Sequence, residues 1–412
     1  MDIKKILITN VYSWQNKGDA AIAISTIEEI KKQFPNAELA ISTFDLNDQG
    51  KYGNFQYYRN IQAIVCGKSK NRIILLNKIL FFLIRIKLFE VLHFFDIPGY
   101  FLFSKQIADK IKHYKEYDLI VASGGGYLLT PSFYSILVKI LFSYDFFFAS
   151  FFNKPYILFN QSIGPFYSKF DFYLLKKFLK LAKIIICREN LSYSRLKKYG
   201  LTNIILSSDI AFNLSSTQCN NLSKYDFNSN NTNIGITVRK WLNRSKQKEY
   251  EKSIAEFIED LLNNSNTHVY FMPQVIFKYS NDEDILTSER IYKLIDNNKK
   301  KRIHIINEDL HPSKLKYMIS QMDYFIGTRM HSNIFALTSH IKTLAIAYEP
   351  KTKGIMKMIN LDEYAIPMEH ITKKSLLEKF SRLKKDSTYL ETLKIEIPIT
   401  QKQSFNNLND YI

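Results

Sequence analysis

The chain has 412 residues, too many for one typical hydrophobic core, so its length predicts two domains. Hydrophobic residues make up 46% of it, which excludes a disordered protein, and its three cysteines have the spacing of neither a metal site nor a disulfide framework. The formal net charge of +18 fits either an anionic partner or a compositional bias; because no arginine-rich tract or nucleic-acid motif is present, we expect no nucleic acid among the partners.

The first half of the chain alternates strands and helices from its start. We expect strands at 4–9, 38–43, 119–122, 156–160, 184–187 and 204–206, and helices at 20–34, 170–181 and 191–199. This alternation is typical of a parallel sheet covered by helices. The N-terminus has no apolar signal core and no cleavage site, so we expect a cytoplasmic protein.

A basic and apolar segment, about residues 72–113, interrupts this series. Lys78, Arg85, Lys87 and Glu90 leave no apolar run near the roughly 18 residues that a membrane-spanning helix needs. The pattern is typical of amphipathic helices with basic residues on one face. Such helices either pack on a sheet, the interpretation that we favour, or rest on an acidic bilayer.

Residues 215–232 are rich in Asn and Ser and predict a linker. A second series follows, with strands expected at 233–238, 268–272, 303–306, 324–326 and 343–347, and helices at 249–262, 284–295, 313–322 and 334–338. The predicted fold is therefore α/β, with parallel domains at 1–214 and 233–371 and a C-terminal helix and tail at 372–412. Two such halves facing each other would enclose a cleft.

Asn16 to Asp19 lies between the first strand and the first helix. Gly18 lets the backbone turn tightly, and the helix N-terminus that follows can hold an anion or a hydroxyl-rich ligand. Asp19 fits two roles, a helix cap or a ligand contact, and the sequence leaves both open.

Polar and glycine residues also follow later strands of the first half. They are Gly124, Gly125, Gly126, Gln161, Ser162 and Asp209. Three consecutive glycines would let a ligand approach backbone N–H groups, although a turn that requires a positive φ also explains them. The pair Arg188-Glu189 after another strand fits either a ligand site or a structural ion pair.

Gly327 to His331 follows the strand 324–326 and opens a helix. Arg329 and His331 can both face a cleft there, because ligands of open α/β sheets bind at the carboxyl ends of the strands. Arginine binds phosphate or carboxylate in a fork, and histidine transfers protons near neutral pH. Arg239, directly after another buried strand, supplies a second candidate anion contact. These residues predict chemistry on an anionic substrate.

As an ordered set, these motifs resemble the polysaccharide pyruvyl transferase family. The set comprises Asn16 to Asp19, Ser123 to Gly126, Gln161 to Pro165, Arg188-Glu189, Asp209 to Phe212, Val238-Arg239 and Gly327 to His331. Met330 stands where the family more commonly has leucine. The resemblance covers roughly residues 5–350 and leaves out Arg72 to Phe103 and the tail after Thr372.

The resemblance implies a fold like that of GT-B glycosyltransferases, with two Rossmann-like domains. It implies a reaction that moves the enolpyruvyl unit of phosphoenolpyruvate onto a sugar as a cyclic ketal and releases phosphate, with no metal or bound organic cofactor. The acceptor would be a sugar of a lipid-linked exopolysaccharide, capsule or cell-wall glycan precursor, made at the inner face of the cytoplasmic membrane.

On this interpretation His331 is the general acid and then the general base. The expected donor contacts are Arg329, Arg239, Gly327 and Thr328. The expected acceptor or cleft-lining residues are Asn16, Gly18, Asp19, Gly124, Gly125, Gly126, Gln161, Ser162 and Asp209. Two rivals remain: a GT-B glycosyltransferase that uses a nucleotide sugar and shares the fold, and a non-catalytic carbohydrate-binding member of the same pathway, whose sequence would have lost Arg329 or His331.

Overall fold

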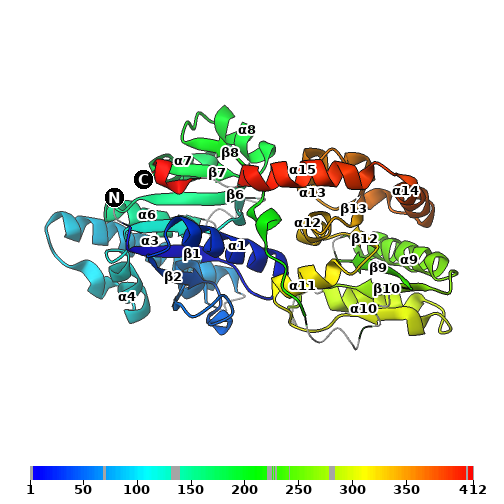
Figure 1. The fold of residues 1–412 in the computed structure, drawn as a ribbon. Coiled ribbons are helices and arrows are strands. Elements are labelled where there is room, and N and C mark those ends of the chain that lie inside the picture. Colours follow the sequence, from blue (N-terminus) through cyan, green and yellow to red (C-terminus); the bar gives the residue numbers. More distant parts are fainter. Residues whose placement is uncertain are drawn as a thin grey trace. The chain divides into compact units, whose positions relative to one another are not determined.

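The computed structural model describes residues 3–67, 71–130, 140–219, 225, 227, 230–240, 242–277, 284–404 and 407–411. The chain divides into two compact units. Unit 1 comprises Met1–Trp14, Ile22–Ile210 and Phe405–Ile412, and unit 2 comprises Gln15–Ala21 and Ala211–Ser404. Each unit contains one parallel sheet with helices packed on it (Figure 1).

The sheet of unit 1 has eight strands among the described residues, in the order β3-β2-β1-β4-β6-β7-β8, with β5 paired to β6. The strands are β1 (Lys5–Val11), β2 (Glu38–Thr43), β3 (Gln56–Arg59), β4 (Leu119–Ala122), β5 (Gly125–Thr130), β6 (Tyr156–Phe166), β7 (Ile184–Cys187) and β8 (Ile204–Leu206). The helices are α1 (Lys17–Gln33), whose residues up to Ala21 belong to unit 2, α2 (Ile61–Cys66), α3 (Arg72–Phe94), α4 (Lys105–His113), α6 (Tyr144–Phe151), α7 (Lys169–Leu181) and α8 (Asn190–Lys198).

The sheet of unit 2 has six parallel strands among the described residues, in the order β11-β10-β9-β12-β13-β14. They are β9 (Thr232–Thr237), β10 (Thr267–Phe271), β11 (Ile303–Ile305), β12 (Tyr324–Gly327), β13 (Lys342–Ala347) and β14 (Ala365–Pro367). The helices are α9 (Arg244–Leu261), α10 (Asp284–Leu294), α11 (Pro312–Ile319), α12 (Met330–Thr338), α13 (Pro350–Met358), α14 (Lys373–Lys385) and α15 (Tyr389–Ser404).

The central strands form because short aliphatic runs are buried on both faces. All residues of β4 and β7 are buried, and in β1 only Lys5 is exposed. Strands covered by helices on both sides show such continuous apolar runs instead of alternation, which is why the sequence predicts a parallel sheet correctly. Polar residues begin where these runs end, at the carboxyl edge of each sheet.

The expected elements differ from the observed ones mainly at their ends. β6 continues to Phe166, six residues beyond the expected end of the strand, because Gly125 to Thr130 forms β5 and pairs with it. α12 begins at Met330, four residues earlier than expected, with Arg329 as its N-cap. β3 and β14 were not expected at all; they are short edge strands, whose sequences carry a weaker pattern.

The boundary between the units also differs from the expected domain end at 214. Residues from Ala211 onwards belong to unit 2, where Lys316 Nζ donates to the carbonyl of Leu214 over 2.7 Å. The end of the chain belongs to unit 1, where the backbone N–H of Leu408 donates to Gln33 Oε1 over 2.7 Å. Local sequence patterns cannot show such contacts between distant segments.

A buried polar cluster lies under the β2–β3 side of unit 1. The carboxylate of Asp145 accepts from the Tyr114 hydroxyl and, over 3.3 Å, from the amide of Asn60. Lys110 Nζ has no hydrogen-bond partner among the described residues and lies over the rings of Tyr58 and Tyr114, at 5.2 and 5.4 Å. Burial lowers the pKa of Lys110 to about 8, and the charge of Asp145 opposes this shift.

This lowered pKa predicts a pH-dependent stability. Between about pH 8 and the ordinary lysine pKa, the unfolded chain holds a proton on Lys110 that the folded chain has lost, so raising the pH stabilises the folded state. Lys110→Met removes this gain. We expect the melting temperature of Lys110→Met relative to the wild type to fall as the pH rises from about 8 towards 10. If the difference in melting temperature between Lys110→Met and the wild type stayed constant with pH, the lowered pKa of Lys110 would be contradicted.

Candidate active site

The residues of the Gly327-to-His331 motif are placed by the ends of two neighbouring strands in unit 2. Thr237 at the end of β9 accepts, at its Oγ1, the backbone N–H groups of Thr328 (2.9 Å) and Arg329 (3.3 Å). The same oxygen lies 2.9 Å from Ser332 Oγ in the first turn of α12. One hydroxyl thus fixes the whole strand-to-helix turn.

Two residues of this motif serve its framework. A β-carbon on Gly327 would lie 1.7 Å from Oδ1 of Asn333, whose Nδ2 donates to the carbonyl of Gly327 over 3.0 Å. Thr328 is completely buried, and its hydroxyl lies 3.1 Å from that of Tyr250. We had expected both as donor contacts; the burial of the Thr328 side chain instead makes it a support for the turn.

Arg329 is held by a buried carboxylate at the start of α10. Its Nε and Nη2 donate to Asp284 Oδ1 over 3.0 and 2.5 Å, and Asp284 is fully buried. Asp284 Oδ2 also accepts from the backbone N–H groups of Gln274 (2.9 Å) and Val275 (3.0 Å). Burial raises the pKa of Asp284, and the guanidinium and both N–H groups oppose this rise.

The Asn16-to-Asp19 motif lies in unit 2, although we had expected it in the N-terminal domain. Lys17 N–H donates to the carbonyl of Gln274 over 2.8 Å, and Ile276 N–H donates to that of Gln15 over 2.9 Å. Asn16 Oδ1 accepts from the N–H of Gly18 (3.1 Å), and its Nδ2 donates to Asp19 Oδ2 (2.6 Å). The motif therefore joins the carboxyl edge of the second sheet, and Asn16 rather than Asp19 accepts the first N–H groups of α1.

Gly18 and His331 are in direct contact. A β-carbon on Gly18 would lie 2.2 Å from Nδ1 and 2.7 Å from Cγ of the His331 ring, closer than real side chains approach. The half-buried His331 therefore uses the space that a side chain at position 18 would fill. This contact explains why a glycine from the start of the chain belongs to the same site as a histidine more than three hundred residues later.

Lys17 is a site residue that the sequence did not single out. It is almost completely buried, and its Nζ donates to Asp309 Oδ1 over 2.5 Å. The neighbouring His311 has its pKa lowered first by burial and then by the charges of Lys17 and Lys314. A lysine inside an Asn-Lys-Gly-Asp turn looks solvated in sequence, and nothing local indicates a partner at position 309.

Arg239 and Gln274 complete the polar residues of this edge. Arg239 is buried two residues after β9, and its guanidinium carbon lies 4.0 Å from the centre of the Tyr348 ring. Gln274 follows β10 and is buried, and neither polar atom of its side chain has a hydrogen-bond partner among the described residues. A buried amide without partners is costly, so this position suits a group that meets a ligand.

The candidate residues of unit 1 hydrogen-bond largely to other residues of unit 1, although Gln161 Oε1 has no partner among the described residues. Gln161 is fully buried and donates to Ser123 O (2.7 Å) and Tyr127 Oη (2.9 Å). Arg188 Nε donates to Ser162 Oγ and its Nη1 to Asp209 Oδ2, each over 2.8 Å. Arg188 thus forms a structural ion pair, with Asp209 as the partner instead of the adjacent Glu189.

The glycine triplet lies at the start of β5. Gly125 and Gly126 are the first residues of β5. A β-carbon on Gly124 would lie 2.7 Å from the carbonyl oxygen of Asn160 and 2.8 Å from Ile22 Cγ2, so close packing explains this glycine. In the sequence, a glycine required for close packing cannot be distinguished from a glycine required for phosphate binding.

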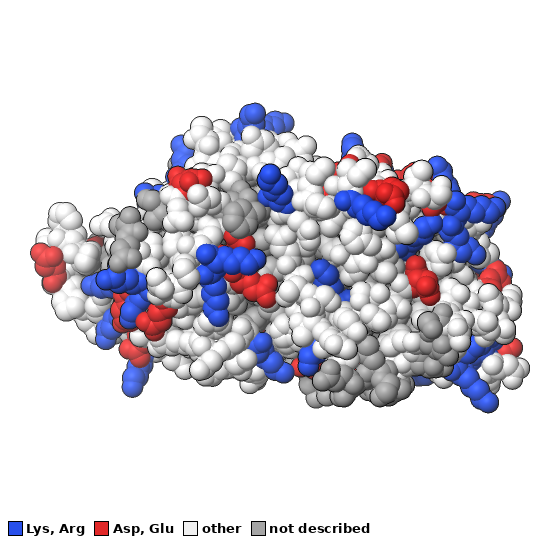
Figure 2. Space-filling view, viewed as in Figure 1, with Lys and Arg blue, Asp and Glu red and all other residues white. Residues whose placement is uncertain are grey.

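The cations of the unit 2 site are buried, unlike most of the charged side chains of the protein. On the face drawn in Figure 2, lysine and arginine side chains are scattered among acidic ones. Lys17, Arg239 and Arg329 are each less than a tenth exposed. Buried positive charges are costly, and an anionic ligand would offset this cost. The histidine at the same sheet edge could transfer a proton to or from such a ligand.

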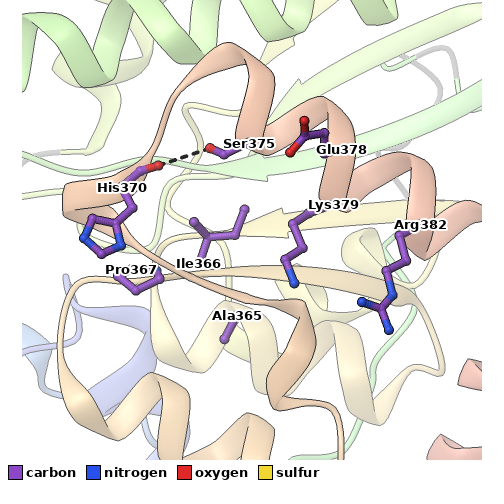
Figure 3. A pocket seen from close by; sticks show the side chains of 8 residues that line it. All are labelled: Ala365, Ile366, Pro367, His370, Ser375, Glu378, Lys379 and Arg382. Atoms are coloured by element: carbon purple, nitrogen blue, oxygen red, sulfur yellow. Dashed lines mark hydrogen bonds between the residues drawn. The ribbon is translucent and has the colours of Figure 1, made fainter.

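A surface pocket elsewhere in unit 2 contains none of these residues (Figure 3). It is lined by Ala365, Ile366, Pro367, His370, Ser375, Glu378, Lys379 and Arg382. Its cations are already engaged by one residue outside it: Lys379 Nζ donates to the carbonyl of Glu363 over 2.7 Å, and Arg382 pairs with the Glu363 carboxylate. We therefore assign the site to the carboxyl edge of the sheet.

The chain is similar in sequence to a family of known proteins and to one curated relative. The family model described as polysaccharide pyruvyl transferase matches residues 16–350. The chain is similar to the amylovoran biosynthesis protein AmsJ of Erwinia amylovora, with 23% identity over 399 residues and 91% of each chain covered.

Two solved structures show a similar fold at low identity. One is a putative UDP-N-acetylglucosamine 2-epimerase from Listeria monocytogenes, with a TM-score of 0.59 and 11% identity over 98% of this chain and 94% of that one. The other is a UDP-glucose: anthocyanidin 3-O-glucosyltransferase in complex with UDP, with a TM-score of 0.57 and 10% identity over 100% and 99%. At these identities the likeness concerns the fold alone, and it confirms the expected GT-B-like α/β class.

The contact between Gly18 and His331 can be tested by one methyl group. Gly18→Ala should displace the His331 ring and shift its NMR signals in histidine-labelled protein, with the signals assigned by their loss in His331→Asn. Gly354→Ala is the matched control, because a β-carbon there meets nothing within 4 Å. Unchanged His331 signals in Gly18→Ala would show that the ring does not pack on this glycine.

The Asp284–Arg329 pair can be tested by stability. Asp284→Ala should lower the free energy of unfolding by about 3–5 kcal/mol, because a buried guanidinium and two N–H groups lose their acceptor. Glu349→Ala removes the partner of Lys351 in a pair with side chains 30% and 33% exposed, and should cost about 0–1 kcal/mol. The free energy of unfolding is measured by urea denaturation. An equal decrease in the two variants would contradict a supporting role for Asp284.

Proposed function

Because the chain belongs to the polysaccharide pyruvyl transferase family, we propose that it moves the pyruvyl group of phosphoenolpyruvate onto a sugar of a polysaccharide precursor as a ketal and releases phosphate. The name of its relative AmsJ places that protein in amylovoran biosynthesis, which supports a polysaccharide as the product here. The proposed acceptor is lipid-linked, at the inner face of the cytoplasmic membrane.

One observation carries the donor assignment: His331 shares a strand-to-helix turn with Arg329, and the loop around Lys17 reaches the same sheet edge. Phosphoenolpyruvate carries a phosphate and a carboxylate. We assign Arg239, Arg329 and Lys17 to this anion, since charge-assisted hydrogen bonds from buried cations are strong. The partnerless amide of Gln274 is the candidate for an additional hydrogen bond to it.

The proposed reaction begins with His331 donating a proton to C3 of the enol, which leaves C2 as an oxocarbenium ion stabilised by its phosphate-bearing oxygen. A first sugar hydroxyl adds to C2, and its proton returns to His331. The C2–O bond to phosphate then breaks, and phosphate leaves with the electron pair. The second hydroxyl adds to C2 and loses its proton, which balances the proton taken up by the released phosphate.

The supporting residues have defined tasks in this scheme. The two cations Arg239 and Arg329 would stabilise the charge that gathers on the departing phosphate. Asp284 holds the planar guanidinium of Arg329 on one edge, so that its orientation is fixed before the substrate binds. Gly18 leaves the space in which the His331 ring lies beside the anion site.

The test is phosphate release from phosphoenolpyruvate with a panel of lipid-linked or nitrophenyl hexosides. His331→Asn should reduce acceptor-dependent release by about 10²–10⁴-fold, the usual contribution of a general acid–base group. His340→Asn is the matched control: this exposed histidine has φ 58°, a conformation that asparagine adopts readily.

Two outcomes would overturn the proposal. Undiminished phosphate release in His331→Asn would show that another residue transfers the proton. Thermal stabilisation by nucleotide sugars, with none from phosphoenolpyruvate, would instead favour a glycosyltransferase on the same fold.

A further inference from the structure

Helix α3 of unit 1 buries only a narrow stripe of its surface. Ile79, Phe82, Ile86 and Phe89 are buried at a spacing of three and four residues. Phe82 packs on Tyr144 with ring centres 5.1 Å apart, and Phe89 packs on the rings of α6 and of the segment before α4. This stripe packs on neighbouring helical segments, and it accounts for less than half of the helix circumference.

The opposite side of α3 is largely apolar and exposed, with the exposed Asn77 as a polar residue among its members. At 3.6 residues per turn, Leu80, Ile84, Leu88 and Val91 run along the side opposite to the buried stripe, and they are 54%, 54%, 44% and 52% exposed. The exposed large apolar residues of α3 as a whole are Ile73, Ile74, Leu76, Leu80, Phe81, Ile84, Leu88, Val91 and Phe94. An ordinary surface helix carries polar residues on this side, so the apolar face requires a partner.

Exposed apolar residues also follow the end of the helix in the sequence. Phe95, Ile97 and Phe101, in the turn and the short helical segment Gly99–Leu102, are 65%, 45% and 71% exposed. Together with the exposed side of α3 they form what we call the α3 face. Scattered exposed apolar residues are normal on proteins, but so many on one helix and the turn that follows it are not.

The charged residues of α3 lie along the two borders of its apolar face. By the same helical geometry, Lys78 and Arg85 fall on one border, and Arg72 and Lys87 on the other. Glu90 is the single acidic residue of the helix and pairs with Lys87 over 2.5 Å. Basic side chains at these borders can extend their charged ends away from an apolar layer while their stems remain in it.

From this arrangement we propose that the α3 face lies in the surface layer of an anionic lipid bilayer, with the helix axis parallel to the membrane. The apolar side chains would enter the acyl boundary, and the basic borders would meet anionic headgroups. Among the described residues, no helix has the length and apolarity to cross a bilayer. The proposal does not depend on the chemistry of the donor.

A second copy of the chain is the competing occupant of this face. Two α3 faces packed on each other would bring basic borders against basic borders, with one acidic residue per helix to offset four basic ones. An anionic bilayer offers charges of the opposite sign over the whole length of the helix. Charge complementarity therefore favours lipid.

The test is co-sedimentation with vesicles of phosphatidylcholine, alone or mixed with phosphatidylglycerol, at low and high salt. The wild type should bind the mixed vesicles, more weakly at high salt, and bind pure phosphatidylcholine far less. Leu80→Ser/Ile84→Ser/Val91→Ser should reduce binding roughly tenfold or more at either salt, because it removes buried apolar area. Lys78→Gln/Arg85→Gln should reduce binding on the order of tenfold at low salt only.

Matched controls exist on other helices. Ile395→Ser/Ile399→Ser changes two exposed apolar residues of α15, and Lys177→Gln/Lys180→Gln changes two exposed lysines of α7; both should bind like the wild type. All exchanged residues are exposed, so the melting temperatures of the variants should match that of the wild type. Failure of the wild type to bind anionic vesicles would overturn the proposal, as would a dimer in light scattering that the α3 variant abolishes without any change in lipid binding.

Discussion

The geometry of the site depends on one buried carboxylate. Asp284 binds the guanidinium of Arg329 on one side and the backbone N–H groups of Gln274 and Val275 on the other. The carbonyl of Gln274 in turn receives the N–H of Lys17, so the loop from the start of the chain is fixed by the same group. A carboxylate removed from water is stable only with such complete hydrogen bonding, and this requirement holds the ends of β10, β12 and α1 together.

A fixed set of dipoles and charges is what an anionic reaction requires. Because Thr237 and Asp284 orient the turn before any ligand arrives, the proposed transfer of negative charge to the leaving phosphate would need little reorganisation of the site. The cost of burying Lys17 and Arg329 is offset by Asp309 and Asp284, so the cations are available in a partly dry environment. The site is thus built from compensated pairs rather than from isolated charges.

The sequence predicted the parts of this structure that are local. The alternation of strands and helices, the Gly327-to-His331 turn and a helix at the apolar segment all follow from periodicity and turn residues. It did not predict Asp284 or Lys17, because their roles rest on contacts between segments up to 292 residues apart. It also left the role of Gly124 open, since a glycine needed for close packing and one needed for a ligand give the same signal.

The division of the chain between the two units has a consequence for how the protein can be dissected. Unit 2 contains Gln15–Ala21, and unit 1 contains the residues that follow Ser404. A C-terminal fragment that begins after Ile210 would therefore lack Lys17 and Gly18, and so the groups that meet Asp309 and His331. Neither half is a self-contained module that could be exchanged between proteins; a functional chimera would have to transplant the N-terminal loop together with the C-terminal sheet.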